Sequence, residues 1–232
     1  MVTLTDVSKI YVKGDDRICA LDHVNIDIAA GTFCAFVGPS GCGKSTLLNV
    51  IAGLDIPTSG VISLDGRSTA SYTADDWTRA RRHSIGIVFQ AFHLIPGLTV
   101  QENVAFPLLL RGEQGRTVRA RVADVLALVR MSHRAEHRPS ELSGGEQQRV
   151  AVARSIVHEP KILLADEPTG NLDSQHGAEI VDLLRTLVED FRHTVLLVTH
   201  SAAAAQAADY VWAMKDGQLT TRTVRTVAAQ EV

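Results

Sequence analysis

The stretch of sequence that decides the fold is GPSGCGKS, residues 38–45. It follows an apolar run at residues 33–37, which is typical of a buried strand, and it leads into a helical segment from Lys44 to Ala52 that Gly53 can end. A strand, a glycine-rich turn ending in Lys-Ser, and a helix are the parts of a phosphate-binding loop. A plain glycine turn before a helix is the alternative, and the strand and helix on either side of the turn disfavour it.

The chemistry of such a loop follows from its backbone. Glycines let the chain approach phosphate oxygens closely, and the N–H groups at the helix start carry partial positive charge. Lys44 is expected to bind β- and γ-phosphates, and Ser45 is expected to ligate Mg²⁺. The residues expected to contact the nucleotide here are Gly38, Pro39, Ser40, Gly41, Cys42, Gly43, Lys44, Ser45 and Thr46.

The order of the remaining elements indicates an α/β fold. Residues 1–35 alternate between apolar and polar types, which predicts an antiparallel β subdomain. Apolar runs at residues 162–165 and 195–198, separated by a helical segment, are typical of buried strands in a parallel sheet. We therefore expect a P-loop NTPase core with a mainly parallel central sheet, an N-terminal antiparallel β subdomain and an inserted α-helical subdomain.

The predicted boundaries divide a single domain, residues 1–232. Residues 1–89 and 161–219 are expected to form the catalytic core with its β subdomain, and residues 90–160 the helical subdomain. Residues 220–232 are polar and unpatterned, which indicates a loose tail. Two capping boxes are expected to start helices in the helical segment: Thr99 with Glu102, and Ser143 with Glu146.

Composition limits the function classes. The net charge of −3 gives no overall attraction to nucleic acid, so no nucleic-acid partner is expected. No apolar run approaches the ~20 residues that span a bilayer, and no signal peptide is visible at the N-terminus. A membrane role would therefore need spanning helices from another chain. Cys19, Cys34 and Cys42 lack metal-ligand spacing and are expected to be reduced.

Two carboxylates close the apolar run at residues 162–165. Because the carboxyl ends of parallel strands meet at the ligand crevice, Asp166 and Glu167 are expected beside the phosphate loop. Asp166 can hold Mg²⁺ through its water shell, and Glu167 can act as general base for the attacking water. Two solvated carboxylates at a strand end are the alternative, which the phosphate loop disfavours.

Two more strand ends carry polar side chains. His200 follows the apolar run at residues 195–198 and is expected to hydrogen-bond the γ-phosphate and orient the water. Gln90 follows the apolar run at residues 85–89 and is expected to reach both Mg²⁺ and the water. Taken alone, either residue is an ordinary surface residue, so both interpretations depend on the phosphate loop.

The sequence LSGGEQQ, residues 142–148, needs a separate explanation. Two glycines in the first turn lower helix propensity by about 1 kcal/mol each relative to alanine. They permit a ligand to approach bare N–H groups, which predicts a second anion site at a helix start. An ordinary capped helix start is the alternative.

Together the motifs resemble the ATP-binding proteins of ABC transporters, over nearly the whole chain from Tyr11 to about Leu219. LSGGEQQ is similar to the signature motif of that family, and it lies between the phosphate loop and LLADE, residues 163–167, in the family's order. The resemblance also implies a Q-loop glutamine at Gln90, a D-loop that includes Asp173, a switch histidine at His200, and an aromatic residue at Tyr11 that stacks on adenine.

The resemblance implies ATP binding and hydrolysis, with Mg²⁺, at the interface of two copies. Each site would join the phosphate loop of one copy to Ser143, Gly144 and Gly145 of the other. The energy would drive a separate membrane permease, which would place the chain at the cytoplasmic face of the membrane.

Longer stretches resemble one branch of the family. VFQAFHLIPGLTVQENVAFPLLL, residues 88–110, and RPSELSGGEQQRVA, residues 138–151, are similar to the ATPases of macrolide export and lipoprotein release, with cell-division ATPases as close relatives. By this resemblance residues 92–110 would receive a permease helix, with Leu98 as an apolar anchor. Ser201 departs from the family, which usually has an acidic residue there, and this puts the local positioning of the neighbouring histidine in question.

Two other functions remain alternatives. A soluble ABC ATPase of DNA repair or translation generally has a long coiled-coil insertion or two ATPase domains, and neither is visible here. A small-molecule kinase on the same loop would leave LSGGEQQ unexplained. The arginines between residues 111 and 138 indicate either a solvated helix face or a surface that contacts a partner or lipid headgroups.

Overall fold

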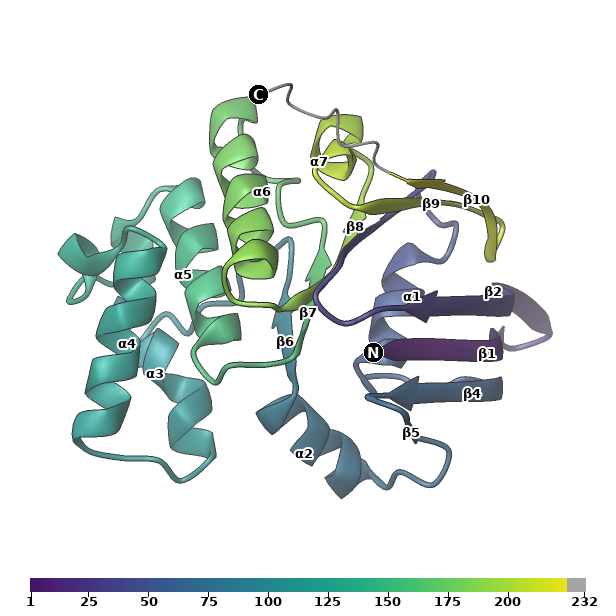
Figure 1. Cartoon of the computed structure of the whole chain (residues 1–232), viewed down its shortest axis with the longest axis horizontal. Helices are drawn as coiled ribbons and strands as arrows, with labels where there is room; N and C mark the ends of the chain where they lie inside the picture. Colours follow the sequence, from purple (N-terminus) through teal and green to yellow (C-terminus); the bar gives the residue numbers. More distant parts are fainter. Residues whose placement is uncertain (225–232) are drawn as a thin grey trace, which may run out of the picture.

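The computed structural model describes residues 1–224, which form two β-sheets and a group of helices (Figure 1). The strands are β1 (Val2–Lys13), β2 (Asp16–Ile28), β3 (Phe33–Val37), β4 (Ser59–Leu64), β5 (Arg67–Ser68), β6 (Ile85–Val88), β7 (Ile162–Asp166), β8 (Thr194–Thr199), β9 (Tyr210–Lys215) and β10 (Gln218–Val224). The helices are α1 (Lys44–Ile51), α2 (Ala74–His83), α3 (Val100–Leu110), α4 (Arg116–Leu128), α5 (Gly144–Ile156), α6 (Ser174–Glu189) and α7 (Ala202–Gln206), with 3₁₀ turns η1 (Ser132–Arg134) and η2 (Pro139–Glu141).

The central sheet has the strand order β10-β9-β3-β8-β7-β6, and all its neighbouring pairs are parallel except β9 with β10. The second sheet has the order β2-β1-β4-β5 and is antiparallel. The expected α/β fold, with a mainly parallel central sheet and an antiparallel N-terminal sheet, is therefore confirmed. In Figure 1 the antiparallel sheet lies on one side of the central sheet and helices α3 to α5 lie on the other.

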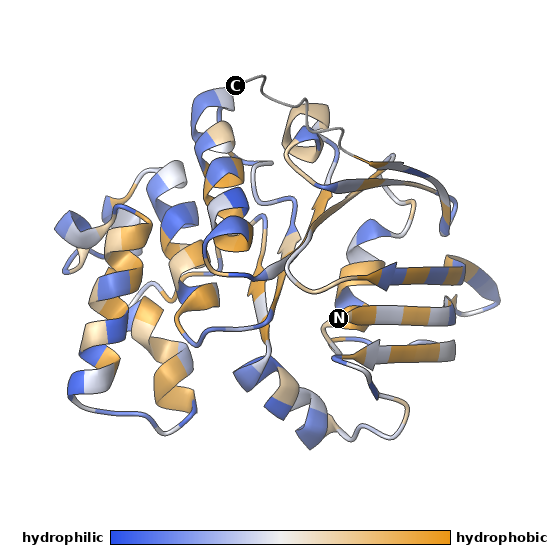
Figure 2. Ribbon diagram, in the orientation of Figure 1, coloured by the Kyte–Doolittle hydropathy of each residue, from blue (hydrophilic) through white to orange (hydrophobic). Residues whose placement is uncertain are grey.

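Strands β3, β7 and β8 consist mainly of apolar residues because each face of the sheet lines a different core. In β8, Val195 and Leu197 face the core shared with α3 to α6, whereas Leu196 and Val198 face the core between the two sheets. Helix α1 is packed in this second core through Leu47 and its neighbours. Burial on both faces explains the continuous orange of these strands in Figure 2 and the runs without polar residues in the sequence.

The helical segment begins at the capping boxes that the sequence predicts. Thr99 and Glu102 exchange side-chain and backbone hydrogen bonds at the start of α3, and Ser143 and Glu146 do so at the start of α5. The helices of this segment share one apolar core with the central sheet. The subdomain boundaries near residues 90 and 160 therefore stay a prediction, because the packing is continuous across them.

The predicted loose tail is wrong for part of its length. Residues 220–224 belong to β10, which pairs with β9 through a register that includes Arg222 with Trp212. The Arg222 guanidinium also lies over the ring of Tyr210, 4.0 Å from its centroid. This cation–π contact helps to hold a strand that has few apolar side chains. Residues 225–232 lie outside the described residues.

Three of the seven arginines between residues 111 and 138 have carboxylate partners. Arg111 and Arg121 both pair with Glu113, and Arg134 pairs with Glu146. These pairs favour the interpretation as a solvated, internally paired helix face.

A buried histidine, His158, joins the end of α5 to the central sheet. Its Nε2 donates to the carbonyl oxygen of Ile85 at 3.2 Å, while its Nδ1 has no hydrogen-bond partner among the described residues. Burial lowers the pKa of His158 to about 4, and the positive charges of Arg111, His83 and His193 add to this effect. Protonation of His158 Nδ1 at low pH would therefore bury a positive charge and an N–H group without an acceptor.

This histidine predicts a pH-dependent stability. The unfolded state binds a proton at about pH 6.5 and the folded state only near pH 4, so stability falls as the pH falls between these values. The contribution approaches about 1.4 kcal/mol per pH unit. His158→Gln keeps a donor for the Ile85 carbonyl but cannot titrate, so its unfolding free energy, measured by urea denaturation from pH 7 to 5, should fall less steeply than that of the wild type. Parallel pH profiles would contradict this assignment.

Candidate functional site

The phosphate loop joins β3 to α1, and its shape depends on glycine. Gly43, at the N-cap of α1, has φ 104°, and a Cβ there would lie 2.1 Å from the carbonyl oxygen of Ala20. A side chain at this position is therefore excluded by both conformation and space. No side chain caps α1, so its first N–H groups are available to an anion.

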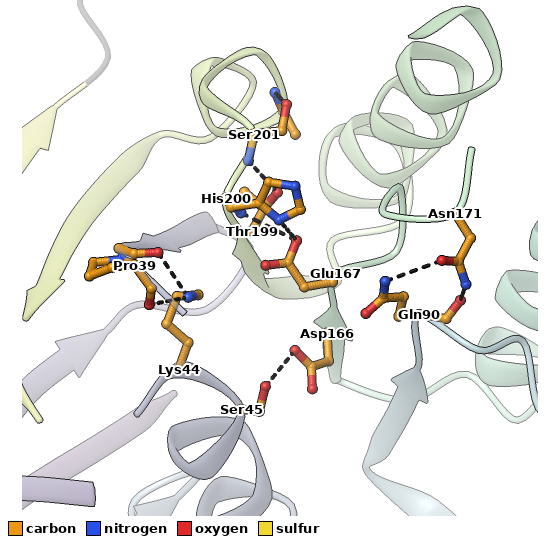
Figure 3. A network of polar contacts seen from close by, with 12 residues as sticks. Pro39, Lys44, Ser45, Gln90, Asp166, Glu167, Asn171, Thr199, His200 and Ser201 are labelled. Atoms are coloured by element: carbon orange, nitrogen blue, oxygen red, sulfur yellow. Dashed lines mark hydrogen bonds and ion pairs between the residues drawn. The ribbon is translucent and has the colours of Figure 1, made fainter. Parts of the chain in front are cut away.

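Lys44 is 7% exposed, and its side chain folds back onto the phosphate loop that precedes it. Its Nζ donates to the carbonyl oxygens of Gly38 at 2.9 Å and Pro39 at 3.0 Å (Figure 3). A third neighbour is the Cys42 sulfur, at 4.0 Å, which is itself buried inside the loop. The ammonium group is thus held within the anion-binding loop.

Asp166 lies across from the first turn of α1. Ser45 Oγ donates to its Oδ1 at 3.0 Å, so the hydroxyl and carboxylate predicted to hold Mg²⁺ are in contact (Figure 3). Burial raises the pKa of Asp166, Glu167 adds to this effect, and the Ser45 hydrogen bond opposes it. Hard oxygen ligands beside a phosphate loop fit Mg²⁺, and a cation would offset the cost of burying this carboxylate.

Glu167 has a backbone conformation that is unusual for its residue type, with φ 47°. Its N–H donates to the Val198 carbonyl oxygen at 2.9 Å, which extends the β7–β8 pairing by one residue and turns the chain sharply. Its Oε2 accepts from the backbone N–H of His200 at 3.2 Å and lies 2.9 Å from His200 Nδ1. The strain is held by these contacts from the neighbouring strand, as is common at functional sites.

Gln90 lies just beyond β6 and is tied to the segment after Glu167. Its Nε2 donates to Asn171 Oδ1 at 3.2 Å, and Asn171 Nδ2 donates back to the Gln90 carbonyl oxygen at 3.0 Å. In Figure 3 this pair lies on one side of Asp166 and Glu167, with Lys44 and Ser45 on the other. The sequence predicts Gln90 at this site, whereas its amide partner Asn171 follows only from the structure.

Ser143 starts α5 and is exposed. Its Oγ accepts from the Glu146 N–H at 3.3 Å, and Glu146 Oε2 accepts from the Ser143 N–H at 2.8 Å. Arg134 Nε, 3.1 Å from Glu146 Oε1, compensates the carboxylate charge at this helix start. The serine hydroxyl therefore keeps its own proton free to donate.

The two glycines that follow Ser143 have different surroundings. A Cβ at Gly145 would lie 2.7 Å from Cδ2 of the His176 ring and 3.2 Å from the His176 Cβ, so the ring would have to move aside to admit a methyl group. A Cβ at Gly144 would make only ordinary contacts, the nearest at 3.7 Å to Leu172. His176 in turn lies 2.7 Å from Asp173 Oδ2 through its Nδ1. His176 thus links the start of α5 to the predicted D-loop, and no pattern in the sequence predicts this contact.

Tyr11 lies on β1 near the C-terminal end of α1. Its hydroxyl donates to Asp55 Oδ2 at 2.7 Å, and the residue as a whole is 38% exposed. Burial and Asp55 raise the pKa of Tyr11, with Thr46 acting in the opposite direction. An exposed aromatic ring beside the phosphate-loop helix is suited to stack on a nucleotide base.

The contacts within the structure divide the predicted residues into two groups. Loop residues 38–46, Asp166, Glu167 and His200 meet at the carboxyl edge of the central sheet, with Gln90 beside them (Figure 3). Gly144 lies near Leu172, and Gly145 lies against His176, which is hydrogen-bonded to Asp173. Asp173 and His200 share a cleft of about 410 Å³ between α6 and α7.

Comparison with known proteins decides the family. The sequence profile described as "ABC transporter" matches residues 21–170. The chain belongs to the ABC transporter ATP-binding family. It is similar to the ATP-binding protein MJ0796 of Methanocaldococcus jannaschii, with 44% identity over 94% of this chain and 95% of that protein.

Solved structures agree with this assignment. The dimeric MJ0796 cassette in a post-hydrolysis state bound to ADP and Pi superposes with a TM-score of 0.90, at 42% identity, over 97% of this chain and 99% of that chain. The chain is also 42% identical to the macrolide export ATP-binding/permease protein MacB of Brucella melitensis, over 97% of this chain but 35% of that protein. The chain thus spans about a third of the length of the MacB relatives. As an ABC cassette, it is an ATP-binding ATPase.

Ser201, the departure from the usual ABC pattern, has a clear role as the N-cap of α7. Its Oγ accepts from the Ala204 N–H at 3.2 Å, a bond that an aspartate could also form. The backbone of His200 is held independently through Glu167. The backbone position of His200 therefore does not depend on an acidic residue at position 201.

The two signature glycines predict different responses to the same change. Gly145→Ala should lower stability by about 1–3 kcal/mol because its methyl group meets His176. Gly144→Ala, the matched control, should leave the melting temperature within about 2 °C of wild type. His176→Ala in the Gly145→Ala background should restore most of the loss. Equal melting temperatures for the two single variants would show that the His176 contact does not limit residue 145.

Proposed function

We propose that two copies of this chain bind two ATP molecules between them. Each site would join Lys44 and Ser45 of one copy to Ser143 and Gly144 of the other. The observation that carries the proposal is that two helix starts suited to anions, those of α1 and α5, have different neighbours within one copy. Lys44 contacts Gly38 and Pro39, whereas Gly145 lies against His176. The dimeric structures of MJ0796, to which the chain is similar, support it.

The start of α5 has the chemistry for such a role. Ser143 Oγ is occupied as an acceptor by the Glu146 N–H, so the hydroxyl proton remains to donate to a phosphate oxygen. Within one copy, Gly144 has room for a methyl group. Its glycine is therefore explained by a ligand that approaches from outside the chain rather than by its own packing.

Hydrolysis is assigned to the carboxyl edge of the central sheet. Glu167 would act as general base for the attacking water, and His200 would contact the γ-phosphate and hold the Glu167 carboxylate in place. Lys44 would bind the β- and γ-phosphates. Ser45, Asp166 and Gln90 would hold Mg²⁺, which supplies charge neutralisation at the phosphates when bound.

This assignment predicts the behaviour of one conservative variant. Glu167→Gln keeps the side-chain shape but removes the base, so ATP turnover should fall by at least about 100-fold while ATP binding persists. The variant should accumulate as an ATP-bound dimer in size-exclusion chromatography. Adding Ser143→Arg to Glu167→Gln should abolish the dimer, since the new side chain would block the partner's γ-phosphate site. A dimer that survives Ser143→Arg would contradict the shared site, and full turnover by Glu167→Gln would contradict the base.

We further propose that the cassette drives a membrane permease and works at the cytoplasmic face of the membrane. The names of the MacB relatives, which join an ATP-binding part to a permease part, support this. Among residues 1–224 no helix is both long and apolar enough to cross a bilayer. None of the reported relatives supports the alternative of a soluble ATPase in DNA repair or translation, since they are transport proteins by name.

A groove between α2 and α3 is the proposed docking site for a permease helix. It has a volume of about 550 Å³, and its lining is largely apolar. Ile95, Phe106 and Leu110 line it, with Phe106 and Leu110 partly exposed. Leu98, the anchor expected from the sequence, lies outside this lining, because its turn packs back on Asn103.

The groove offers a matched pair of leucines. Leu109 and Leu110 are each 50% exposed, but only Leu110 lines the groove. Leu110→Asp should therefore weaken copurification with the permease by about tenfold or more and leave the ATPase rate of the isolated chain unchanged, whereas Leu109→Asp should affect neither. Equal losses for the two variants would show that the exposed apolar face of α3, rather than the groove, is recognised.

A further inference from the structure

Two charged residues, Lys9 and Asp55, hold the base-stacking residue Tyr11 and have no role in the function proposed above. Asp55 Oδ2 accepts from the Tyr11 hydroxyl at 2.7 Å, and Asp55 Oδ1 accepts from Lys9 Nζ at 2.5 Å. The Lys9 and Asp55 side chains are only 13% and 28% exposed, compared with 38% for Tyr11 as a whole. The ion pair is therefore more sheltered than the ring that it holds.

Asp55 is fixed by the backbone as well as by Lys9. Its Oδ1 also accepts from the Ile56 N–H at 2.8 Å, and its own N–H donates to the Asn49 carbonyl oxygen in α1 at 3.2 Å. Lys9 Nζ closes the arrangement by donating to the Ile56 carbonyl oxygen at 2.8 Å. The carboxylate that holds Tyr11 is thus attached to the end of the same helix that starts with the phosphate loop.

Lys9 also covers one face of the aromatic ring. Its Nζ lies 4.9 Å from the Tyr11 ring centroid, a cation–π distance. A planar base can therefore stack only on the opposite face. Thr46, in the first turn of α1, acts on the Tyr11 hydroxyl by lowering its pKa, in opposition to burial and Asp55.

We propose that Asp55 and Lys9 are positioning residues for the nucleotide base. They act through the Tyr11 hydroxyl and ring face, and they hold the ring at a fixed place relative to the phosphate loop. The proposal rests on the stacking role proposed for Tyr11. Because a ring held in advance loses less conformational freedom on binding, the pair raises affinity for the nucleoside part of ATP and leaves the phosphate part unaffected.

The test compares ATP with inorganic tripolyphosphate, which offers phosphates without a base. In purified chain, Tyr11→Phe and Asp55→Asn should each raise KM for ATP by about three- to tenfold, the size of one hydrogen bond, with kcat within about twofold. The inhibition constant of tripolyphosphate should stay within about twofold of wild type. The Tyr11→Phe/Asp55→Asn double variant should be no worse than Asp55→Asn alone, because loss of the Tyr11 hydroxyl then removes only a contact that Asp55→Asn has already weakened. Lys9→Met, of similar length but neutral, should act in the same direction.

Several results would overturn the proposal. Additive losses in the double variant would mean that Asp55 does not act through Tyr11, and equal weakening of tripolyphosphate would mean that Asp55 merely supports the loop fold. A Tyr11→Ala variant distinguishes the stacking role of Tyr11 from the positioning role of Asp55 and Lys9. If Tyr11→Ala leaves KM for ATP unchanged, the stacking role itself is wrong; if it raises KM while Asp55→Asn and Lys9→Met do not, only the positioning role is wrong.

Discussion

The site depends on the register in which three parallel strands are paired. Val37 of β3 lies opposite Thr199 of β8, and Asp166 of β7 lies opposite Val198. The three strands therefore end at the same level, so the phosphate loop, Glu167 and His200 leave the sheet side by side. This register is fixed because each strand has apolar side chains on both faces, which pack into two separate cores. A shift by one residue would exchange the side chains of those two cores and would also separate the phosphate loop from Glu167 and His200.

The electrostatics of the site follow from this crowding. Asp166 and Glu167 lie next to one another where phosphates must also bind, and burial raises the pKa of Asp166. Lys44 and the uncapped start of α1 supply positive charge on one side. At the other anion-suited helix start, Glu146 is needed for the capping box, and its charge is offset by Arg134. At both helix starts, positive side chains therefore offset the nearby carboxylates, and backbone N–H groups remain available to an anion.

The sequence predicts the features that have a strong local signal, and the structure adds those that depend on distant contacts. The phosphate loop, the capping boxes and the apolar strand ends are visible as patterns because each is built from neighbouring residues. Helix α2 has a single buried apolar residue, Trp77, and therefore lacks the usual periodicity. Strand β10 is polar because stacking of Arg222 replaces apolar burial. Partners such as Asp55 and His176 are ordinary polar residues whose roles arise only when β1 meets the end of α1, or α5 meets α6.

The contact between Gly145 and His176 has a consequence for how this chain can evolve. As long as residue 176 carries a ring, the cost of any side chain at residue 145 includes a clash within the same copy. Loss of the ring has to come first, and only afterwards would residue 145 be limited solely by the proposed contact with the nucleotide of the other copy. The two positions are therefore epistatic, and the order of substitutions matters. The residue at position 176 therefore determines which substitutions at position 145 the fold can accept.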